Sequence, residues 1–261
     1  MKRFTYILGA AAICLGLAAQ ANAQSVTSVA NSPHNLNYAS IQAKGVAPVT
    51  SSGGGTTEVC LPCHTPHNGS EASLGLLWNH DVTATATSYN LYNNVFTTDN
   101  SGTTSSNPEL DNTTLLCLSC HDGSIAVDNY GGNKTDNNID IQAIGSWAKV
   151  SAADATNDLS GDHPLGIGYP GLPKETSVVA GSFTNTAGTP GAGFVDPTNA
   201  AGPFGTGGVG GIAKVKLVAL PNGYMGVGCV SCHEPHDFSE KFLRSSTGNN
   251  SSAVCFGCHI K

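Results

Sequence analysis

Eight of the nine cysteines in this chain of 261 residues lie in one short pattern: two cysteines separated by two residues, with a histidine directly after the second. The pattern occurs at Cys60–His64, Cys117–His121, Cys229–His233 and Cys255–His259. Two thiols at this spacing reach the two vinyl groups on one edge of a haem, and the histidine then points at the iron as its proximal ligand. The motifs therefore predict four covalently attached haems of the c type.

The residues assigned to this chemistry fall into two sets. The predicted attachment sites are the thiols Cys60, Cys63, Cys117, Cys120, Cys229, Cys232, Cys255 and Cys258. The predicted proximal ligands are His64, His121, His233 and His259. Four disulfides would also suit an exported protein, and paired Cys-x-x-Cys motifs can bind zinc. Neither alternative requires a histidine directly after every second cysteine, so we favour haem.

The chain is a doubled unit. Segment 60–74 aligns with 229–243 without a gap and with eight identities, and both contain the motif Cys-x-x-Cys-His-x-Pro-His. A plain Cys-x-x-Cys-His motif follows each of them, and a lone histidine, His34 or His163, precedes each. Each half therefore holds two motifs and four histidines, the number that two six-coordinate irons require.

The histidines that recur in both halves are the predicted distal ligands: His34, His67, His163 and His236. His80 is left over, because the ungapped alignment places Asn249 opposite it. We expect His80 not to bind iron, and its neighbour Trp78 to pack or to lie at a haem edge. Met225 precedes Cys229 by four residues and is expected to fill space rather than to ligate.

The histidine three residues beyond a proximal ligand is under a geometric constraint. His67 lies one turn of chain from His64, with a proline between them, so it cannot reach the opposite face of the haem that His64 binds. It must bind a second haem, and the same holds for His236. We expect His67 to serve the haem at 117–120 and His236 the haem at 255–258. One short peptide then ligates two irons and brings neighbouring haems close together.

Two histidines on every iron have chemical consequences. Ligation by two histidines gives lower reduction potentials than ligation by histidine and methionine. It also leaves no open coordination position for a substrate, which favours electron transfer over catalysis.

The composition favours an irregular fold. The chain has 32 glycines and 13 prolines, and only 11% of its residues are charged. Strands are predicted at Val178–Phe183 and Lys214–Leu220, and a short helix at Ser239–Ser245. We expect a mostly irregular (coil) chain with short helices and a few short strands, a multihaem cytochrome fold organised around four covalent haems. The haems would supply much of the core, so we expect no stable fold without them.

The first residues read as an export signal. Lys2 and Arg3 precede the apolar stretch Ile7–Leu17, and Ala21-Asn22-Ala23 offers a cleavage site for signal peptidase. The predicted organisation is a signal peptide at 1–23, a first dihaem unit at 24–150 and a second at 151–261. The second unit contains a glycine-rich insertion at about 164–228, and the two units form one compact domain.

Charge and hydropathy narrow the location and the partners. The formal net charge of -7 becomes -9 without Lys2 and Arg3, so the surface does not suit nucleic acid. The apolar stretch of the leader is too short to span a bilayer, and no later segment approaches about 18 apolar residues. We expect an exported protein without a membrane span, periplasmic or extracellular, at the cell surface. The cationic residues Lys241 and Arg244, near the second Cys-x-x-Cys-His-x-Pro-His motif, are candidate partners of haem propionates.

Several of these motifs resemble those of the doubled-CXXCH multihaem cytochromes of metal-reducing bacteria, including the tetrahaem cytochromes that polymerise into extracellular nanowires. The resemblance rests on both Cys-x-x-Cys-His-x-Pro-His motifs, Trp78-Asn79, the run Cys117-Leu-Ser-Cys-His-Asp-Gly-Ser, Asp162-His163-Pro164 and the closing Cys255-Phe-Gly-Cys258-His. It covers residues 32–261 loosely and is tight only at the haem motifs.

The resemblance implies a continuous chain of bis-histidine haems, a largely irregular fold and electron transfer to external acceptors. In filament-forming relatives one distal histidine comes from the neighbouring subunit, and His34 is the candidate donor here. The expected partners are redox proteins, extracellular electron acceptors or further copies of the chain in a homopolymer. The alternative function is a multihaem oxidoreductase with one open coordination site, resembling enzymes of nitrite or hydroxylamine chemistry.

Overall fold

The computed structural model describes sixteen segments of the chain: 29–30, 32–36, 50–51, 54–55, 59–67, 69, 76–82, 89–92, 109–131, 139–144, 149–150, 158–172, 193–197, 215–236, 242–244 and 253–260. The predicted signal peptide at 1–23, the predicted strand Val178–Phe183 and Lys241 lie outside these segments. So does most of the glycine-rich insertion.

The regular elements in the described segments are short. The helices are α3 (Asn112–His121), α4 (Ile141–Ile144), α5 (Cys229–Cys232) and α6 (Ala253–Phe256). The strands are β1 (Thr50–Ser51), β2 (Gly54–Gly55), β3 (Asn90–Leu91), β4 (Asp158–Leu159), β5 (Ile167–Gly168), β6 (Val218–Ala219) and β7 (Met225–Val227). Between these elements the described segments have turns and irregular backbone. The organising role of haem stays a prediction.

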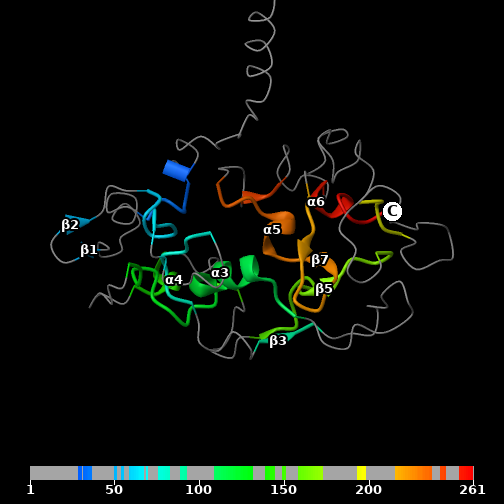
Figure 1. Cartoon of the computed structure of the whole chain (residues 1–261), viewed down its shortest axis with the longest axis horizontal. Helices are drawn as coiled ribbons and strands as arrows, with labels where there is room; N and C mark the ends of the chain where they lie inside the picture. The colour runs from blue at the N-terminus through cyan, green and yellow to red at the C-terminus, as the bar shows by residue number, and fades with distance from the viewer. Residues whose placement is uncertain are drawn as a thin grey trace, which may run out of the picture.

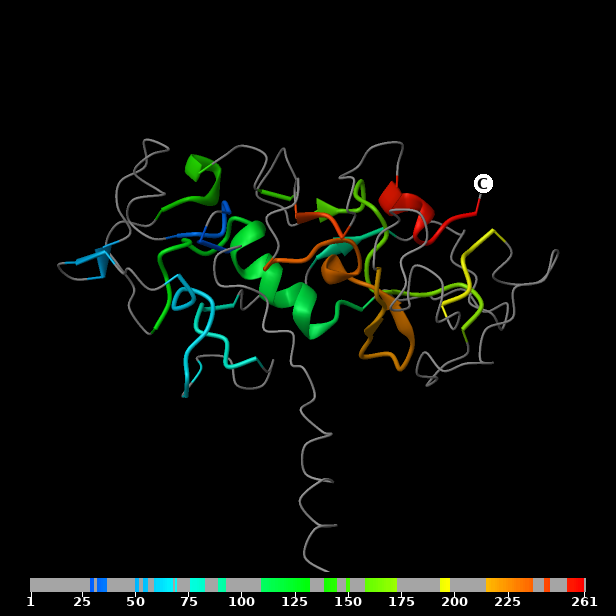
Figure 2. The ribbon, with the colours of Figure 1, turned by 90° about the horizontal axis from the view of Figure 1, so that it is seen from above.

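The α3 helix is ten residues long and lies at the centre of the molecule (Figures 1 and 2). It begins after Asp111, whose side chain accepts a hydrogen bond from the Thr114 backbone N–H at 3.1 Å. Such a side-chain cap satisfies one of the N–H groups that a helix end leaves without a partner. The helix buries Leu116 and Leu118. Its last turn carries the second haem motif.

The strands form three small sheets. The β1 and β2 strands pair antiparallel, and β5, β7 and β6 form a three-stranded antiparallel sheet with β7 in the middle. Gly226 on β7 has to be a glycine, because a Cβ atom there would lie 2.2 Å from the Ile167 carbonyl oxygen. The parallel pair β3–β4 joins Asn90 of the first predicted unit to Asp158 of the second. The two halves are therefore connected through backbone hydrogen bonds.

The buried apolar side chains lie in separate clusters within the described segments. One is formed by Val127, Tyr130, Ile139 and Ile141. A second contains Leu110, Leu118 and Leu159, and a third contains Val218, Leu220 and Val230. The clusters are small, so protein side chains alone give each motif only a limited apolar support.

Two of the elements predicted from the sequence can be compared with the structure. The β6 strand lies within the predicted strand Lys214–Leu220, and its exposed Ala219 lies between buried Val218 and Leu220. The predicted helix Ser239–Ser245 is described only at 242–244. Phe242 has a φ of 57°, in the left-handed region, so a right-handed helix through this residue is wrong.

Candidate haem-binding site

Each motif folds as a single turn of chain. In the first, third and fourth motifs the histidine N–H donates to the carbonyl oxygen of the first cysteine, at 2.8 Å for His64, 3.1 Å for His233 and 2.8 Å for His259. In the second motif α3 provides the same spacing up to His121. Residues at positions i, i+3 and i+4 of such a turn share one face, so the two thiols and the imidazole of a motif lie on the same side.

The eight motif cysteines are free thiols. The four disulfides considered as an alternative are therefore not formed. Burial raises the pKa of Cys63, Cys120 and Cys258 to about 12 and that of Cys232 to about 11. A buried thiol stays uncharged because its environment penalises the thiolate. The same environment suits the uncharged thioether that a thiol becomes when it is joined to haem.

Thiols of successive motifs lie near one another. Cys117 and Cys229 share a hydrogen bond, which raises the pKa of Cys117 and lowers that of Cys229. The Cys229 backbone N–H also donates to Thr114 Oγ1 at 3.0 Å, so α3 and α5 are joined at this point. The second and third motifs are therefore direct neighbours.

The remaining motifs extend this series on both sides. Cys63 of the first motif is close enough to Cys120 of the second to interact with it electrostatically. Cys232 of the third motif interacts in the same way with Cys255 and Cys258 of the fourth. The four motifs thus follow one another in space in the order in which they occur along the chain.

The first Cys-x-x-Cys-His-x-Pro-His motif is held by a segment that returns to it. The Thr65 N–H donates to the Leu77 carbonyl at 3.0 Å, and the Asn79 N–H donates to the Cys63 carbonyl at 3.0 Å. The Asn79 side-chain amide adds a hydrogen bond of 2.6 Å to the Leu61 carbonyl. We call residues 77–79 the first return segment.

The second motif of this type is held in the same way by residues 242–244, the second return segment. The Glu234 N–H donates to the Phe242 carbonyl at 2.7 Å, and the Arg244 N–H donates to the Cys232 carbonyl at 2.8 Å. Arg244 Nε donates to the Val230 carbonyl at 2.7 Å, which is the counterpart of the bond from Asn79 to Leu61.

The backbone of the two return segments also agrees. Leu77 has a φ of 50° and Phe242 a φ of 57°, both in a region that L-residues rarely occupy. This equivalence corrects the ungapped alignment, because Trp78 rather than Leu74 corresponds to Leu243. The first connection is longer, so the sequence identity at Leu74 does not reflect the same structural position.

Three of the four predicted distal histidines lie near proximal ones. The ring centroids are 6.1 Å apart for His34 and His121, 6.2 Å for His64 and His236, and 6.4 Å for His163 and His259. The planes of His64 and His236 are inclined by 21°, whereas the other two pairs are crossed at 65° and 66°.

These separations fit a haem iron. A histidine nitrogen lies about 2 Å from a bound transition metal, so two imidazoles on opposite sides of one iron have ring centroids roughly 6 Å apart. Within the described segments, no three residues of the types His, Cys, Asp or Glu form a group that could hold a metal ion. A donor set of two imidazoles with two thiols beside one of them matches c-type haem, in which the porphyrin supplies the other nitrogen ligands.

Exposed apolar side chains flank the same turns. Leu76 is 61% exposed, Leu77 is 48% exposed, and Ile260 next to His259 is also exposed. The Leu76 carbonyl is held 2.9 Å from His64 Nδ1, so this peptide stays against the first motif.

The pairing differs from the one expected. His236 lies against His64 of the first motif, whereas we expected it to serve the haem at 255–258. His34 lies against His121 of its own chain, so no neighbouring subunit is needed to bring these two rings together. Its pKa is lowered to about 4 by burial, which keeps the imidazole neutral and its nitrogen free to ligate.

His67 is exposed, and no pairing with the haem at 117–120 is found for it: His121 of that motif faces His34. His80 is buried, and its two ring nitrogens lie 2.7 Å from the Asp81 carbonyl and 3.0 Å from the Ala126 carbonyl. These contacts suit a structural histidine. Trp78 packs edge-on against His64, with ring centroids 5.7 Å apart.

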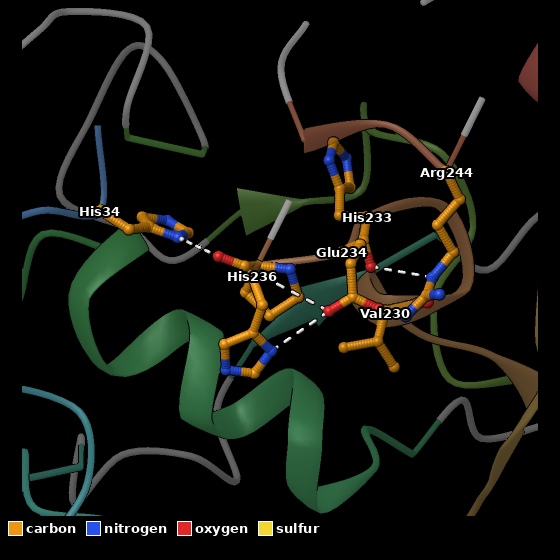
Figure 3. Close-up of polar contacts among 7 residues, drawn as sticks. His34, Val230, His233, Glu234, His236 and Arg244 are labelled. Atoms are coloured by element: carbon orange, nitrogen blue, oxygen red, sulfur yellow. Dashed lines mark hydrogen bonds and ion pairs between the residues drawn. The ribbon is translucent and has the colours of Figure 1, made fainter. Parts of the chain in front are cut away.

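One polar residue of the site was not singled out in the sequence. Glu234 follows His233 directly, and its carboxylate contacts both His236 and Arg244 (Figure 3). Arg244 is thereby engaged within the protein, at 2.7 Å from Glu234, and its contact with a haem propionate stays a prediction. The signal that could have revealed it is the single difference between the sequences CHTPH and CHEPH in the two repeats.

Residues 223–261 match the family described as the doubled CXXCH motif. The match covers the third and fourth motifs and supports a c-type cytochrome-like haem-binding site with an electron-transfer role. No curated protein matches the chain.

Within the described segments, no helix is both long and apolar enough to cross a bilayer.

Proposed function

We propose that this chain is an exported tetrahaem c-type cytochrome that carries electrons along a row of bis-histidine haems. The observation that carries the proposal is the pairing of His121, His64 and His259 with a second imidazole at 6.1 to 6.4 Å. Haem iron supplies the one-electron couple, and the chain supplies attachment, ligands and spacing.

The ligand sets follow from these pairs. His34 and His121 would hold one iron, and His163 and His259 another, so that each lone histidine would serve the plain motif of its own half. His236 would hold the iron of His64 from the other half.

The fourth pair of histidine ligands is assigned from the sequence repeat. His67 occupies in the first half the position that His236 occupies in the second, and His233 is the proximal histidine that remains. We therefore assign His67 to His233. The two motifs of the type Cys-x-x-Cys-His-x-Pro-His then exchange distal ligands.

The order of the motifs supports a continuous path. Thiols of the first and second, second and third, and third and fourth motifs interact with one another. Haems attached at these thiols would have neighbouring attachment points close together, and short separations between haems are what rapid electron hopping requires.

The eight ligands that this scheme uses all come from one chain. This favours a self-contained carrier that delivers electrons to redox proteins or extracellular acceptors. It also counts against the multihaem enzyme, which needs an iron with an open position. Assembly into filaments is a further possibility from the sequence resemblance, and in this scheme it would not depend on a ligand exchanged between subunits.

The first test is haem stoichiometry in the mature protein. Pyridine haemochrome analysis should give four c-type haems per chain, and two or fewer would contradict the proposal. Electron paramagnetic resonance should show low-spin ferric iron. A high-spin signal that responds to nitrite would favour the enzyme instead, and negative-stain microscopy at high protein concentration would distinguish separate particles from filaments.

A further inference from the structure

The carboxylate of Glu234 lies between a proposed iron ligand and a fixed cation (Figure 3). Glu234 Oε1 is 3.2 Å from His236 Nδ1, and Glu234 Oε2 is 2.7 Å from Arg244 Nη2. The side chains of Glu234 and Arg244 are only 20% and 11% exposed. A partly buried pair of this kind is less screened by solvent than a surface ion pair.

Arg244 is itself held in place by the backbone. Its Nε donates to the Val230 carbonyl at 2.7 Å and to the His233 carbonyl at 3.0 Å, both within or next to the third haem motif. Because the guanidinium is fixed, the carboxylate that it binds is also fixed. The cation offsets the long-range field of the carboxylate, so Glu234 acts on His236 mainly through the direct hydrogen bond.

Other proposed ligands use backbone carbonyls for the same ring atom. Nδ1 of His34 lies 3.1 Å from the Pro235 carbonyl, Nδ1 of His64 lies 2.9 Å from the Leu76 carbonyl, and Nδ1 of His163 lies 3.1 Å from the Pro164 carbonyl. A carboxylate accepts a stronger hydrogen bond from an imidazole N–H than a neutral carbonyl does.

We infer that Glu234 is a positioning residue, which directs Nε2 of His236 toward the iron between His64 and His236 and lowers the reduction potential of that haem. A hydrogen bond from Nδ1–H to a carboxylate fixes the tautomer of the ring and makes Nε2 a stronger donor. A stronger donor stabilises the ferric state more than the ferrous state. The inference rests on the proposed function.

The first repeat provides an internal comparison, because Thr65 stands where Glu234 stands in the second. The Thr65 hydroxyl donates to the His67 backbone carbonyl at 2.9 Å, so its contact is with the main chain and not with a carboxylate. The residue between the proximal histidine and the proline therefore makes the two exchanged ligands chemically unequal, although their motifs are otherwise alike.

The test is a redox titration of the four-haem protein and its Glu234→Gln variant, followed by visible absorption and by electron paramagnetic resonance. Nearly parallel imidazole planes give a rhombic low-spin signal and crossed planes a strongly anisotropic one, so the signal of the His64–His236 haem should differ from those of the His34–His121 and His163–His259 haems. When the applied potential equals the wild-type midpoint potential of the His64–His236 haem, the ratio of reduced to oxidised haem at this position should be about fivefold to tenfold higher in Glu234→Gln.

Two further variants keep this test decisive. Glu109→Gln removes an exposed carboxylate elsewhere and should leave all four potentials unchanged. Thr65→Glu adds the missing carboxylate to the first repeat and should lower the potential of the haem served by His67. This second change tests the inference even if Glu234→Gln prevents folding.

The outcomes separate the inference from the proposed function. A wild-type protein without four low-spin haems overturns the proposed function. A wild-type protein with four low-spin haems, in which neither Glu234→Gln nor Thr65→Glu moves a potential, overturns only the role of Glu234. Conversion of the His64–His236 haem to high spin in Glu234→Gln would support positioning, because the ring would no longer be held toward the iron.

Discussion

The two motifs of the type Cys-x-x-Cys-His-x-Pro-His have the same backbone frame and different polar side chains. In both, a return segment that contains a left-handed residue makes the same two backbone hydrogen bonds to the motif. One side chain of the return segment also donates to the carbonyl of the residue that follows the first cysteine. That side chain is the neutral Asn79 in one repeat and the cationic Arg244 in the other. The frame fixes where an imidazole can lie, and the substituted positions set its electrostatic environment.

The comparison also separates what is local from what is not. Each motif turn is closed by hydrogen bonds between near neighbours in sequence, whereas the ring facing His64 comes from His236 in the other half. Local geometry can therefore repeat faithfully while the partner of each histidine is decided by how the halves pack. Three predictions test this separation.

The largest effect is expected from loss of haem attachment. Replacing both cysteines of one motif, as Cys60→Ala with Cys63→Ala or as Cys229→Ala with Cys232→Ala, should leave three haems per chain and strongly reduced folded yield. The apolar clusters are small, so a missing macrocycle removes support that protein side chains do not replace. Intact-protein mass spectrometry counts the haems. If both double variants lose one haem and still fold with full yield, the core does not depend on haem.

A second effect concerns the exchanged ligands. His236→Ala should convert one iron to high spin, whereas His80→Ala, at a histidine that contacts backbone carbonyls, should convert none. Adding His236→Ala to the variant that lacks Cys60 and Cys63 should create no further high-spin iron, because the haem that His236 serves is already missing. Adding His236→Ala to a variant that lacks Cys255 and Cys258 should create one further high-spin iron. Electron paramagnetic resonance measures the high-spin iron in both combined variants. If the further high-spin iron instead arises in the variant that lacks Cys60 and Cys63, His236 serves the haem at 255–258, as the sequence predicted.

The smallest effect is expected at the left-handed residues of the return segments. Leu77→Gly should stabilise the protein by about 0.5–1 kcal/mol, since glycine relieves the unfavourable φ at an exposed position and loses little packing. Phe242→Gly relieves a similar φ but also removes a ring stacked on His34 at 4.2 Å, so it should destabilise by about 1 kcal/mol. Denaturant unfolding followed by haem absorbance gives both values, and equal shifts would show that the stacking contributes nothing.

Part of this arrangement could be predicted from the sequence. The four motifs, the doubled unit and the shortness of the helices and strands follow from residue spacing and composition, because they depend on neighbours along the chain. The equivalence of Trp78 with Leu243 could not be found, because the first connection is longer and an unrelated leucine preserved the ungapped alignment. The partner of His236 also depends on contacts between halves, which residue spacing does not encode.

Glu234 illustrates a different limit. Its position was visible as the one difference within two otherwise identical five-residue stretches from the second cysteine to the distal histidine. Its contacts with His236 and Arg244 were not visible, because Arg244 reaches it only after the return segment has folded back along the motif. A substitution that looks like an ordinary loop change becomes informative once its neighbours are known.

The position of His236 opposite His64 has a consequence for the history of such a chain. After the duplication that produced the two halves, each copy could have remained an independent pair of cofactors. If one half takes an iron ligand from the other half, neither half can be deleted, shortened or transferred to another protein without loss of that ligand. If His236 and His64 hold one iron, the two halves must be inherited together, and a change in the angle between them would alter the ligation of that iron.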